Sequence, residues 1–214
     1  MVGKGVLLEC LDSPKVESVL VINRKTVGIK HEKLKEIIHA DFYNLSTIEK
    51  QMAGYNACYF CLGVSAFRMS EADYTKVTHD LTLHFAETVL RMNPEMTFTY
   101  VTGVGTDSSE KSRTMWARVK GKTENDLLAM PFKAAYMFRP GFIQPMKGIQ
   151  SATKLYNTIY VVFKPLYPLL KAITPNAITS TVQMGQAMIN VTTAGFRSKI
   201  LHSREINELA EFTK

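Results

Sequence analysis

The chain has 214 residues, which suits one large domain and leaves little room for two full ones. Hydrophobic residues make up 46% and charged residues 21%, an ordinary globular composition that argues against a disordered or fibrous chain. The formal net charge of +7 suits an anionic ligand, a nucleic-acid contact or an anionic membrane surface, and does not choose among them. The function must therefore be sought in local motifs.

Short apolar runs alternate with amphipathic stretches, which is typical of a doubly wound α/β domain whose mostly parallel sheet has helices on both faces. Ser46 and Ser70 each stand three residues before an acidic residue, a spacing that predicts a helix-capping box. Residues 18–23 form a β-branched run, which predicts a strand buried on both faces. The predicted elements are a helix over 3–11, strands over 18–23 and 37–40, a short helix over 46–54, a strand over 57–62, a long helix over 70–93, a strand over 97–102, a helix over 112–130 and a strand over 134–138, with a basic loop and a short helix between 24 and 35.

The beginning of the chain is irregular for this pattern. A doubly wound domain normally opens with a strand, whereas this sequence opens inside a helix. A parallel sheet that starts at residue 18 would lack the strand that ordinarily lies at its centre.

Three cysteines do not make a disulfide scaffold, and the odd number argues for a reducing compartment. Cys58 and Cys61 stand on a predicted strand, where residues three apart point to opposite faces, so we interpret them as small core residues. His79 and His84 are five apart, which misses the spacing of a helical zinc pair, and no metal site is expected. The first residues have no apolar signal core, so the sequence predicts a cytoplasmic protein.

The most apolar later stretch covers residues 156–173. It is broken by two prolines and two lysines and falls short of a spanning helix. Two interpretations stay open: a helical pair packed on the domain, or a peripheral contact with a membrane surface or a protein partner. Lys and Arg are scattered without stacking aromatics, so no nucleic-acid partner is expected.

Small and charged residues follow the predicted strands in a fixed order. In this order they resemble the atypical or extended branch of the short-chain dehydrogenase/reductase superfamily, and within it the NAD-dependent epimerase-like and Tat-interacting oxidoreductase-like proteins. The resemblance covers essentially the whole chain and implies a single NAD(P)-binding Rossmann-like domain over 1–214, with a substrate-side helical insertion over 143–198. The residues that carry it are Gly3, Arg24, Lys25, Asp41, Phe42, Leu62, Gly63, Val64, Lys120, Arg139, Pro140 and Gly141.

The resemblance assigns a role to each of these residues. Gly3 matches the third glycine of the phosphate-binding G-x-x-G-x-x-G turn, so the sequence is expected to be truncated by about a dozen residues within that motif, or to be a defective version. Arg24 and Lys25 match the pattern that prefers NADP over NAD, because a guanidinium can grip a 2′-phosphate; a solvated basic loop is the alternative.

The remaining matches concern the adenine and the turns beneath the cofactor. The carboxylate of the Asp41-Phe42 pair would meet the adenine amino group. Leu62-Gly63-Val64 would form the turn beneath the cofactor, and Arg139-Pro140-Gly141 matches the segment after the sixth strand of the family. Residues 199–203 look like the family's last short strand, with Ser203 capping the terminal helix.

Family catalysis uses a Tyr-x-x-x-Lys pair on one helix face and a Ser or Thr after the fifth strand. Lys120 matches the lysine, Thr102 is the hydroxyl at the strand end, and Trp116 stands in place of the tyrosine. An indole N–H only donates, so Trp116 cannot be the acid–base group. We expect an NADP(H)-preferring oxidoreductase or epimerase-like protein, with NAD as the other cofactor, or a non-catalytic cofactor-sensing or interaction module. The substrate and the oligomeric state are not readable.

Overall fold

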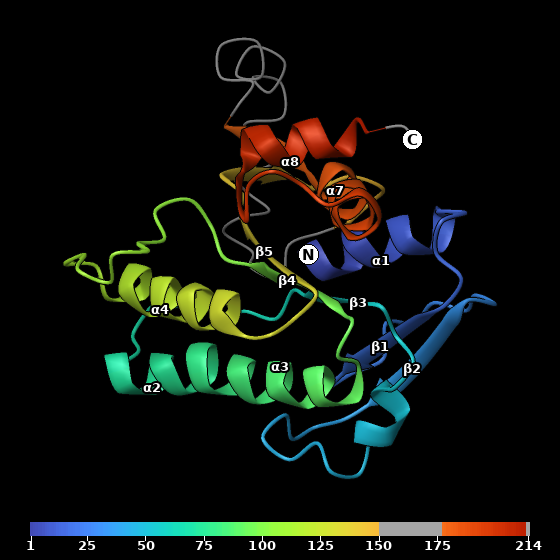
Figure 1. Ribbon diagram of the computed structural model, residues 1–214, viewed down its shortest axis with the longest axis horizontal. Coiled ribbons are helices and arrows are strands. Elements are labelled where there is room, and N and C mark those ends of the chain that lie inside the picture. Colours follow the sequence, from blue (N-terminus) through green and yellow to red (C-terminus); the bar gives the residue numbers. More distant parts are fainter. Residues whose placement is uncertain (150–176, 213–214) are drawn as a thin grey trace.

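The computed structural model describes residues 1–149 and 177–212 (Figure 1). The helices are α1 (Val2–Asp12), α2 (Glu71–Thr75), α3 (Leu81–Met92), α4 (Met115–Ala129), α7 (Thr181–Ala194) and α8 (Ser203–Ala210), with a 3₁₀ turn η1 (Glu49–Met52) and a π-helical turn η2 (Lys76–Asp80). The strands are β1 (Val19–Asn23), β2 (Leu34–Ile38), β3 (Ala57–Phe60), β4 (Thr97–Val101), β5 (Ala134–Arg139), β6 (Phe142–Gln144), β7 (Ile178–Ser180) and β8 (Ile200–His202).

The strands form the middle layer of a three-layer arrangement. Each pairing between described strands is parallel. Helices α1, α7 and α8 lie on one side of the strands, and α2, α3 and α4 lie on the other (Figure 1). The predicted α/β fold, a doubly wound parallel sheet with helices on both faces, is confirmed.

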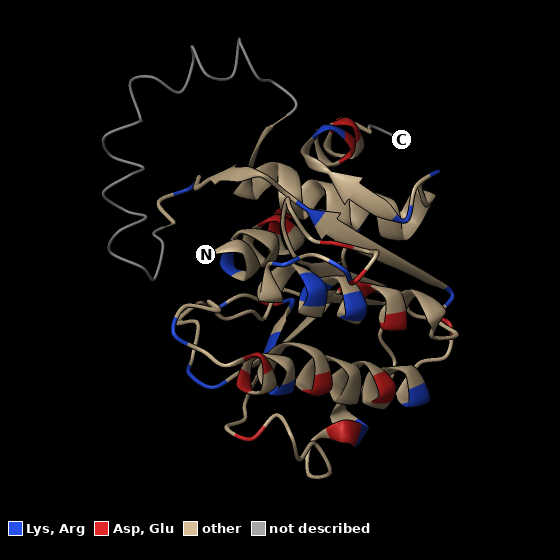
Figure 2. Ribbon diagram, turned by 90° about the vertical axis from the view of Figure 1, so that its left-hand side faces the viewer, with Lys and Arg blue, Asp and Glu red and all other residues tan. Residues whose placement is uncertain are grey.

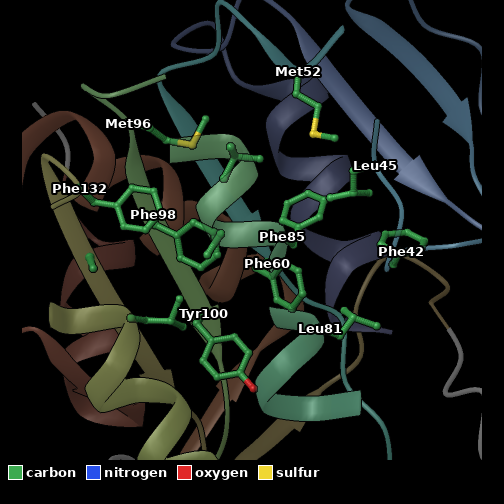
Figure 3. Close-up of a cluster of buried hydrophobic side chains, with 14 of the residues drawn as sticks. Phe42, Leu45, Met52, Phe60, Leu81, Phe85, Met96, Phe98, Tyr100 and Phe132 are labelled. Atoms are coloured by element: carbon green, nitrogen blue, oxygen red, sulfur yellow. The ribbon is translucent and has the colours of Figure 1, made fainter. Parts of the chain in front are cut away.

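Two apolar cores separate the sheet from its helices, and the alternation of side chains along each strand supplies both. Phe98 and Tyr100 of β4 point into the core beneath α3, where they lie near Phe85 (Figure 3). Tyr136 and Phe138 of β5 point into the opposite core, against α7 and α8. Burying one aromatic side chain of this size stabilises the fold by about 1.5–3 kcal/mol, so these layers hold the strand ends in place.

The strands fall into separate sheets rather than one. β1 pairs with β2, β3-β4-β5-β8 form a four-stranded sheet, and β6 pairs with β7. Side chains of β1 and β3 nevertheless contribute to the same two cores, Leu20 and Cys58 to one and Val19 and Tyr59 to the other. β1 and β3 therefore lie in one layer without being paired, among the residues that the structure describes. The expectation that a strand is lacking at the centre of the sheet stays a prediction.

Two strand predictions need correction. β1 is half-buried along its whole length instead of being buried on both faces, because it has a strand neighbour on one side only. The strand predicted over 37–40 covers Leu34–Ile38, and residues 24–33 form no helix. β2 therefore begins earlier than predicted and includes polar residues. One of them, Glu36, is held by hydrogen bonds that its carboxylate accepts from the Thr26 hydroxyl at 2.6 Å and from the Val27 N–H at 2.7 Å.

One of the two predicted boxes forms in part, as a serine cap without the reciprocal bond from the acidic side chain to the serine N–H. The Ser70 hydroxyl oxygen accepts a hydrogen bond from the Asp73 N–H at 3.1 Å and begins α2. The Ser46 box is wrong, because the Ser46 hydroxyl donates to the Asn44 side chain at 2.7 Å and the helical turn η1 begins only at Glu49. Ser203 does not cap the last helix either. Its hydroxyl accepts a hydrogen bond from the Gly141 N–H at 2.8 Å and so joins α8 to the end of β5.

The segment 143–198 contains most of β6, then β7 and α7. α7 packs closely on α1, since a side chain at Gly185 would approach the Glu9 side chain to 2.6 Å. The apolar stretch 156–173 lies outside the described residues, so its two interpretations stay predictions. No helix in the described ranges is long and apolar enough to cross a membrane.

Candidate functional site

The site is built at the carboxyl ends of β4 and β5, where ligands bind in open parallel sheets. Helix α4 follows β4 and passes beside both strand ends. Lys120, on the second turn of α4, donates a hydrogen bond from Nζ to the Thr102 carbonyl oxygen at 3.1 Å. Burial lowers the pKa of Lys120, and the Glu124 carboxylate one turn further along the helix opposes that shift. The structure thus brings the two predicted catalytic residues together.

Glu124 is a residue that sequence reasoning missed as part of the site. Its side chain is 0% exposed and pairs with the Arg139 guanidinium, whose Nε donates to both carboxylate oxygens at 3.1 and 2.9 Å. The Thr102 hydroxyl donates to the same carboxylate at 2.5 Å. A second charged residue one helical turn after Lys120 was the available signal, since residues four apart share a helix face.

Trp116 lies on the same face of α4, one turn before Lys120. The Lys120 ammonium is 5.9 Å from the centroid of the indole ring, a cation–π arrangement. The ring also lies against Gly105 in the loop after β4, where a Cβ would be 3.0 Å from the Trp116 Cη2 atom. Gly105 has a φ of +89°, which favours glycine at this position. The Trp116 ring therefore borders the site and contacts both the loop after β4 and the Lys120 ammonium.

The loop between β4 and α4 is fixed at several points. The Asp107 carboxylate accepts hydrogen bonds from the backbone N–H groups of Ser109, Lys111 and Ser112 at 3.0, 2.9 and 2.7 Å. The Ser109 hydroxyl, which donates to the same carboxylate at 2.7 Å, and these backbone bonds lower the pKa of Asp107 to about 2. The loop also touches α4 directly, because a Cβ at Gly121 would be 1.8 Å from the Asp107 carbonyl oxygen. The loop that the Trp116 ring contacts is consequently fixed both by its own hydrogen bonds and by its packing on α4.

The start of α1 lies close behind β3. A Cβ at Gly3 would be 3.3 Å from the Cys61 Cβ, so this glycine lets the helix approach the strand end. Gly63 has no atom within 4 Å of a Cβ position, which leaves open space beside the turn formed by Leu62, Gly63 and Val64. Both observations suit the phosphate and turn roles that the resemblance implies, and these roles stay predictions.

The basic pair and the Asp41-Phe42 pair differ in their surroundings. Arg24 and Lys25 are exposed just beyond the carboxyl end of β1. Asp41 is exposed, and its carboxylate accepts a hydrogen bond from the Tyr43 N–H at 2.9 Å. Phe42 is buried and stacks on Phe85 with ring centroids 6.4 Å apart, so it belongs to the core beneath α3.

The Arg139-Pro140-Gly141 segment lies mostly inside the protein. Arg139 is 7% exposed, and besides Glu124 its guanidinium donates to the Ser108 hydroxyl at 2.6 Å. The Pro140 carbonyl oxygen accepts from the Val104 N–H at 2.9 Å. In this structure Arg139 links strand β5 to Glu124 on α4 and to Ser108 in the loop after β4. Its assignment to the cofactor stays a prediction.

The thiols of the C-x-x-C pair are packing groups. Cys58 contacts the core beneath α3 and Cys61 the core beneath α7, on opposite faces as predicted. Burial raises the pKa of Cys61 to about 12, so its reactive thiolate form is disfavoured. Among the described residues, no group of three or more His, Cys, Asp or Glu side chains is arranged to hold a metal ion.

Comparison with solved structures defines the class of fold. A short-chain dehydrogenase/reductase superfamily protein from Agrobacterium tumefaciens, solved with bound NAD, superposes with a TM-score of 0.64 at 9% identity, over 94% of this chain and 74% of that one. The ADP-L-glycero-D-manno-heptose-6-epimerase of Helicobacter pylori superposes with a TM-score of 0.65 at 14% identity, over 98% of this chain and 76% of that one. The chain has the Rossmann-like fold of NAD-binding epimerase and dehydrogenase enzymes, and the predicted resemblance to short-chain dehydrogenases/reductases is confirmed.

Particular relatives are found by sequence. Protein FMP52-1, mitochondrial, of the yeast Scheffersomyces stipitis is 23% identical over 218 residues, 98% of this chain and 94% of that protein. Protein HTATIP2 of Rattus norvegicus is 24% identical over 143 residues, 66% of this chain and 58% of that protein. No family model matches the chain.

These relatives correct one prediction. FMP52-1 and FMP52-2 of Scheffersomyces stipitis and FMP52 of Debaryomyces hansenii are all named as mitochondrial proteins. The cytoplasmic location predicted from the first residues is contradicted by this comparison. The physical reason for the error is that a missing secretory signal argues against secretion and does not distinguish between compartments inside the cell.

Proposed function

We propose that the chain is an oxidoreductase or epimerase-like protein that binds a nicotinamide dinucleotide at this edge of the sheet and prefers NADP(H) to NAD(H). One observation carries the proposal: the Lys120 ammonium is held at the carboxyl end of β4 by the Thr102 carbonyl oxygen. Lys120 is partly buried, and this one acceptor leaves its ammonium two further hydrogens to donate.

The residues present fit such a cofactor. Gly3 lets α1 pack closely on the end of β3, and the open space beside Gly63 suits a cofactor that passes close to the backbone. Arg24 and Lys25 are exposed and basic where a 2′-phosphate would need them. When bound, a nicotinamide supplies hydride transfer. Lys120 would hold the nicotinamide ribose through the hydrogens that Thr102 does not accept.

Calorimetric titration of the full chain with NADPH and NADH tests the proposal. We expect saturable binding that Lys120→Met abolishes and Lys122→Met leaves unchanged, since Lys122 is exposed on the same helix and pairs with Asp126 at 2.8 Å. Arg24→Ala should weaken NADPH binding by about 10–100-fold and NADH binding little, because only the former loses a charged hydrogen bond. Absence of saturable binding up to millimolar cofactor contradicts the proposal.

A specific observation also favours the second candidate, a non-catalytic cofactor-sensing or interaction module. Trp116 cannot exchange a proton, and the Thr102 hydroxyl already donates its hydrogen to Glu124. Cofactor binding without turnover of any carbonyl or nucleotide-sugar substrate supports this candidate. Turnover that survives Trp116→Phe and is lost in Lys120→Ala counts against it.

A further inference from the structure

A cavity of about 460 Å³ lies near the amino ends of β1 and β3, at the opposite end of the strands from Lys120. Its volume falls within the range of ~300–1,000 Å³ that is usual for sites binding small molecules. The start of β1, strand β2, the turn η1 and the residues before β3 all contribute to the lining, which includes Ser18, Leu20, Lys35, Ile37, Gln51 and Tyr55. The cavity is therefore separate from the candidate site at the carboxyl ends of β4 and β5.

One part of the cavity surface is apolar. Leu20, Ile37 and Tyr55 are half-buried and pack against the core beneath α3. Leu20 is the partner of Lys35 in the parallel pair of β1 and β2, and Lys35 stands two residues before Ile37. Partners on neighbouring strands, and residues two apart on one strand, share a face of the sheet. The Lys35 side chain therefore starts from the same face as this apolar surface.

The turn before β3 is fixed by the protein itself. The buried Asn93 side-chain oxygen accepts hydrogen bonds from the Gly54 N–H at 2.7 Å and the Tyr55 N–H at 3.0 Å, and its amide donates to the Met52 carbonyl oxygen at 2.9 Å. The Met52 side chain lies with the buried apolar side chains of the core (Figure 3). A wall that is already ordered lowers the free-energy cost of binding a ligand.

The polar side chains around the cavity are free to bind a ligand. In the part of the chain that the structure describes, the side chains of Ser18, Lys35, Gln51 and Tyr55 have no hydrogen-bond or ion-pair partner. Glu36 also contributes to the lining, but it is adjacent to Lys35 on the strand and so points to the other face, where hydrogen bonds from the preceding loop hold its carboxylate. Lys35 thus gives the cavity a positive charge that no neighbouring carboxylate neutralises.

The choice of ligand depends on these local groups. On the face shown in Figure 2, basic and acidic residues are interspersed along the helices. The net charge of +7 attracts anions of every kind, so selection among them requires specific donors beside an apolar surface.

We infer that this cavity binds an aliphatic carboxylate, whose chain lies on the apolar surface and whose carboxylate accepts a hydrogen bond from the Lys35 ammonium. Burial of the chain is favourable in proportion to its apolar area, and an ammonium–carboxylate hydrogen bond is among the strong ones. The Gln51 amide and the Ser18 hydroxyl are further donors at the same cavity. The inference does not rest on the proposed function, because the two sites lie at opposite ends of the strands.

Calorimetric titration of the full chain with octanoate, butyrate and octylamine tests the inference. We expect saturable binding of octanoate, weaker binding of butyrate because it buries less apolar surface, and none of octylamine, whose charge Lys35 repels. Lys35→Gln should weaken octanoate binding by about tenfold, since a charge-assisted hydrogen bond is lost. Lys30→Gln removes another exposed lysine, which lies in the loop before β2 and outside the lining, and should change nothing.

Ser18→Glu gives a second, independent variant, because it places a carboxylate in the lining and should weaken octanoate binding at least as much as Lys35→Gln. Thermal unfolding without ligand checks that each variant is folded. The inference is wrong if octanoate shows no saturable binding up to millimolar concentration, if octylamine binds equally well, or if Lys30→Gln and Lys35→Gln have equal effects. Sedimentation of the ligand-free chain tests another occupant: a dimer that does not bind octanoate would show that a second copy fills the cavity.

Discussion

At the residue scale, the buried pair of Glu124 and Arg139 organises the candidate site. The Glu124 carboxylate accepts hydrogen bonds from the Arg139 guanidinium and from the Thr102 hydroxyl. The Thr102 carbonyl oxygen in turn accepts a hydrogen bond from the Lys120 ammonium. Two charges without water around them are stable only while each has its partner. The pair therefore connects α4, β4 and β5 at the point where the proposed chemistry takes place.

We expect Glu124→Gln to destabilise the protein by about 3–5 kcal/mol, because it leaves the Arg139 charge buried without its partner. Urea unfolding of both proteins measures the difference. Glu49→Gln, which removes the partner of exposed Arg91 at 3.0 Å, is the control and should cost about 1 kcal/mol or less. Equal losses in the two variants would mean that Arg139 finds another partner or solvent.

At the scale of elements, the two serine motifs show what a short pattern can determine. Ser70 and Ser46 stand in the same spacing, yet only Ser70 accepts the backbone N–H three residues on. The difference lies in Asn44, whose side-chain oxygen accepts from both the Ser46 N–H and the Ser46 hydroxyl and so fixes a local turn there. Side chains that bond locally compete with helix capping in this way.

Ser70→Ala should lower the free energy of unfolding by about 1 kcal/mol, because the Asp73 N–H at the start of α2 loses its acceptor. Ser46→Ala removes the same hydroxyl from a matched motif and should change stability by less than about 0.5 kcal/mol, as expected for an exposed group. Thermal unfolding of the pair checks both values. The assignment fails if Ser46→Ala proves the more damaging change.

At the scale of the whole molecule, the division of the sheet predicts unequal stability. β1 and β2 form a two-stranded unit that is half-buried or exposed, whereas β4 and β5 lie inside a four-stranded sheet and are largely buried. Two strands alone are marginal in water. Local opening should therefore begin at β1 and β2.

Hydrogen exchange followed by mass spectrometry tests this. Peptides covering residues 19–38 should exchange at least about tenfold faster than those covering 97–101 and 134–139, because they open without unfolding the large sheet. Peptides that cover α4 give the exchange rate of the candidate site for comparison. Uniform exchange over all strands would show that the two sheets unfold as one unit.

The sequence predicted the features that depend on residues close together in the chain, and it missed those that depend on contacts between residues far apart. The alternation of strands and helices, the Ser70 cap and the pairing of Lys120 with the end of β4 follow from local periodicity or from the family pattern. The role of Glu124 on α4 depends on Arg139, fifteen residues later on strand β5, and only the fold brings the two together. No pattern within one helix contains that information.

The unpaired sides of β1 and β3 have a consequence for how the molecule meets other chains. Alternate backbone N–H and C=O groups of a paired strand point away from its partner, so within residues 1–149 and 177–212 each of these strands presents a row of them without a second strand neighbour. Such rows are templates for an added strand, whether from a peptide or from a neighbouring copy.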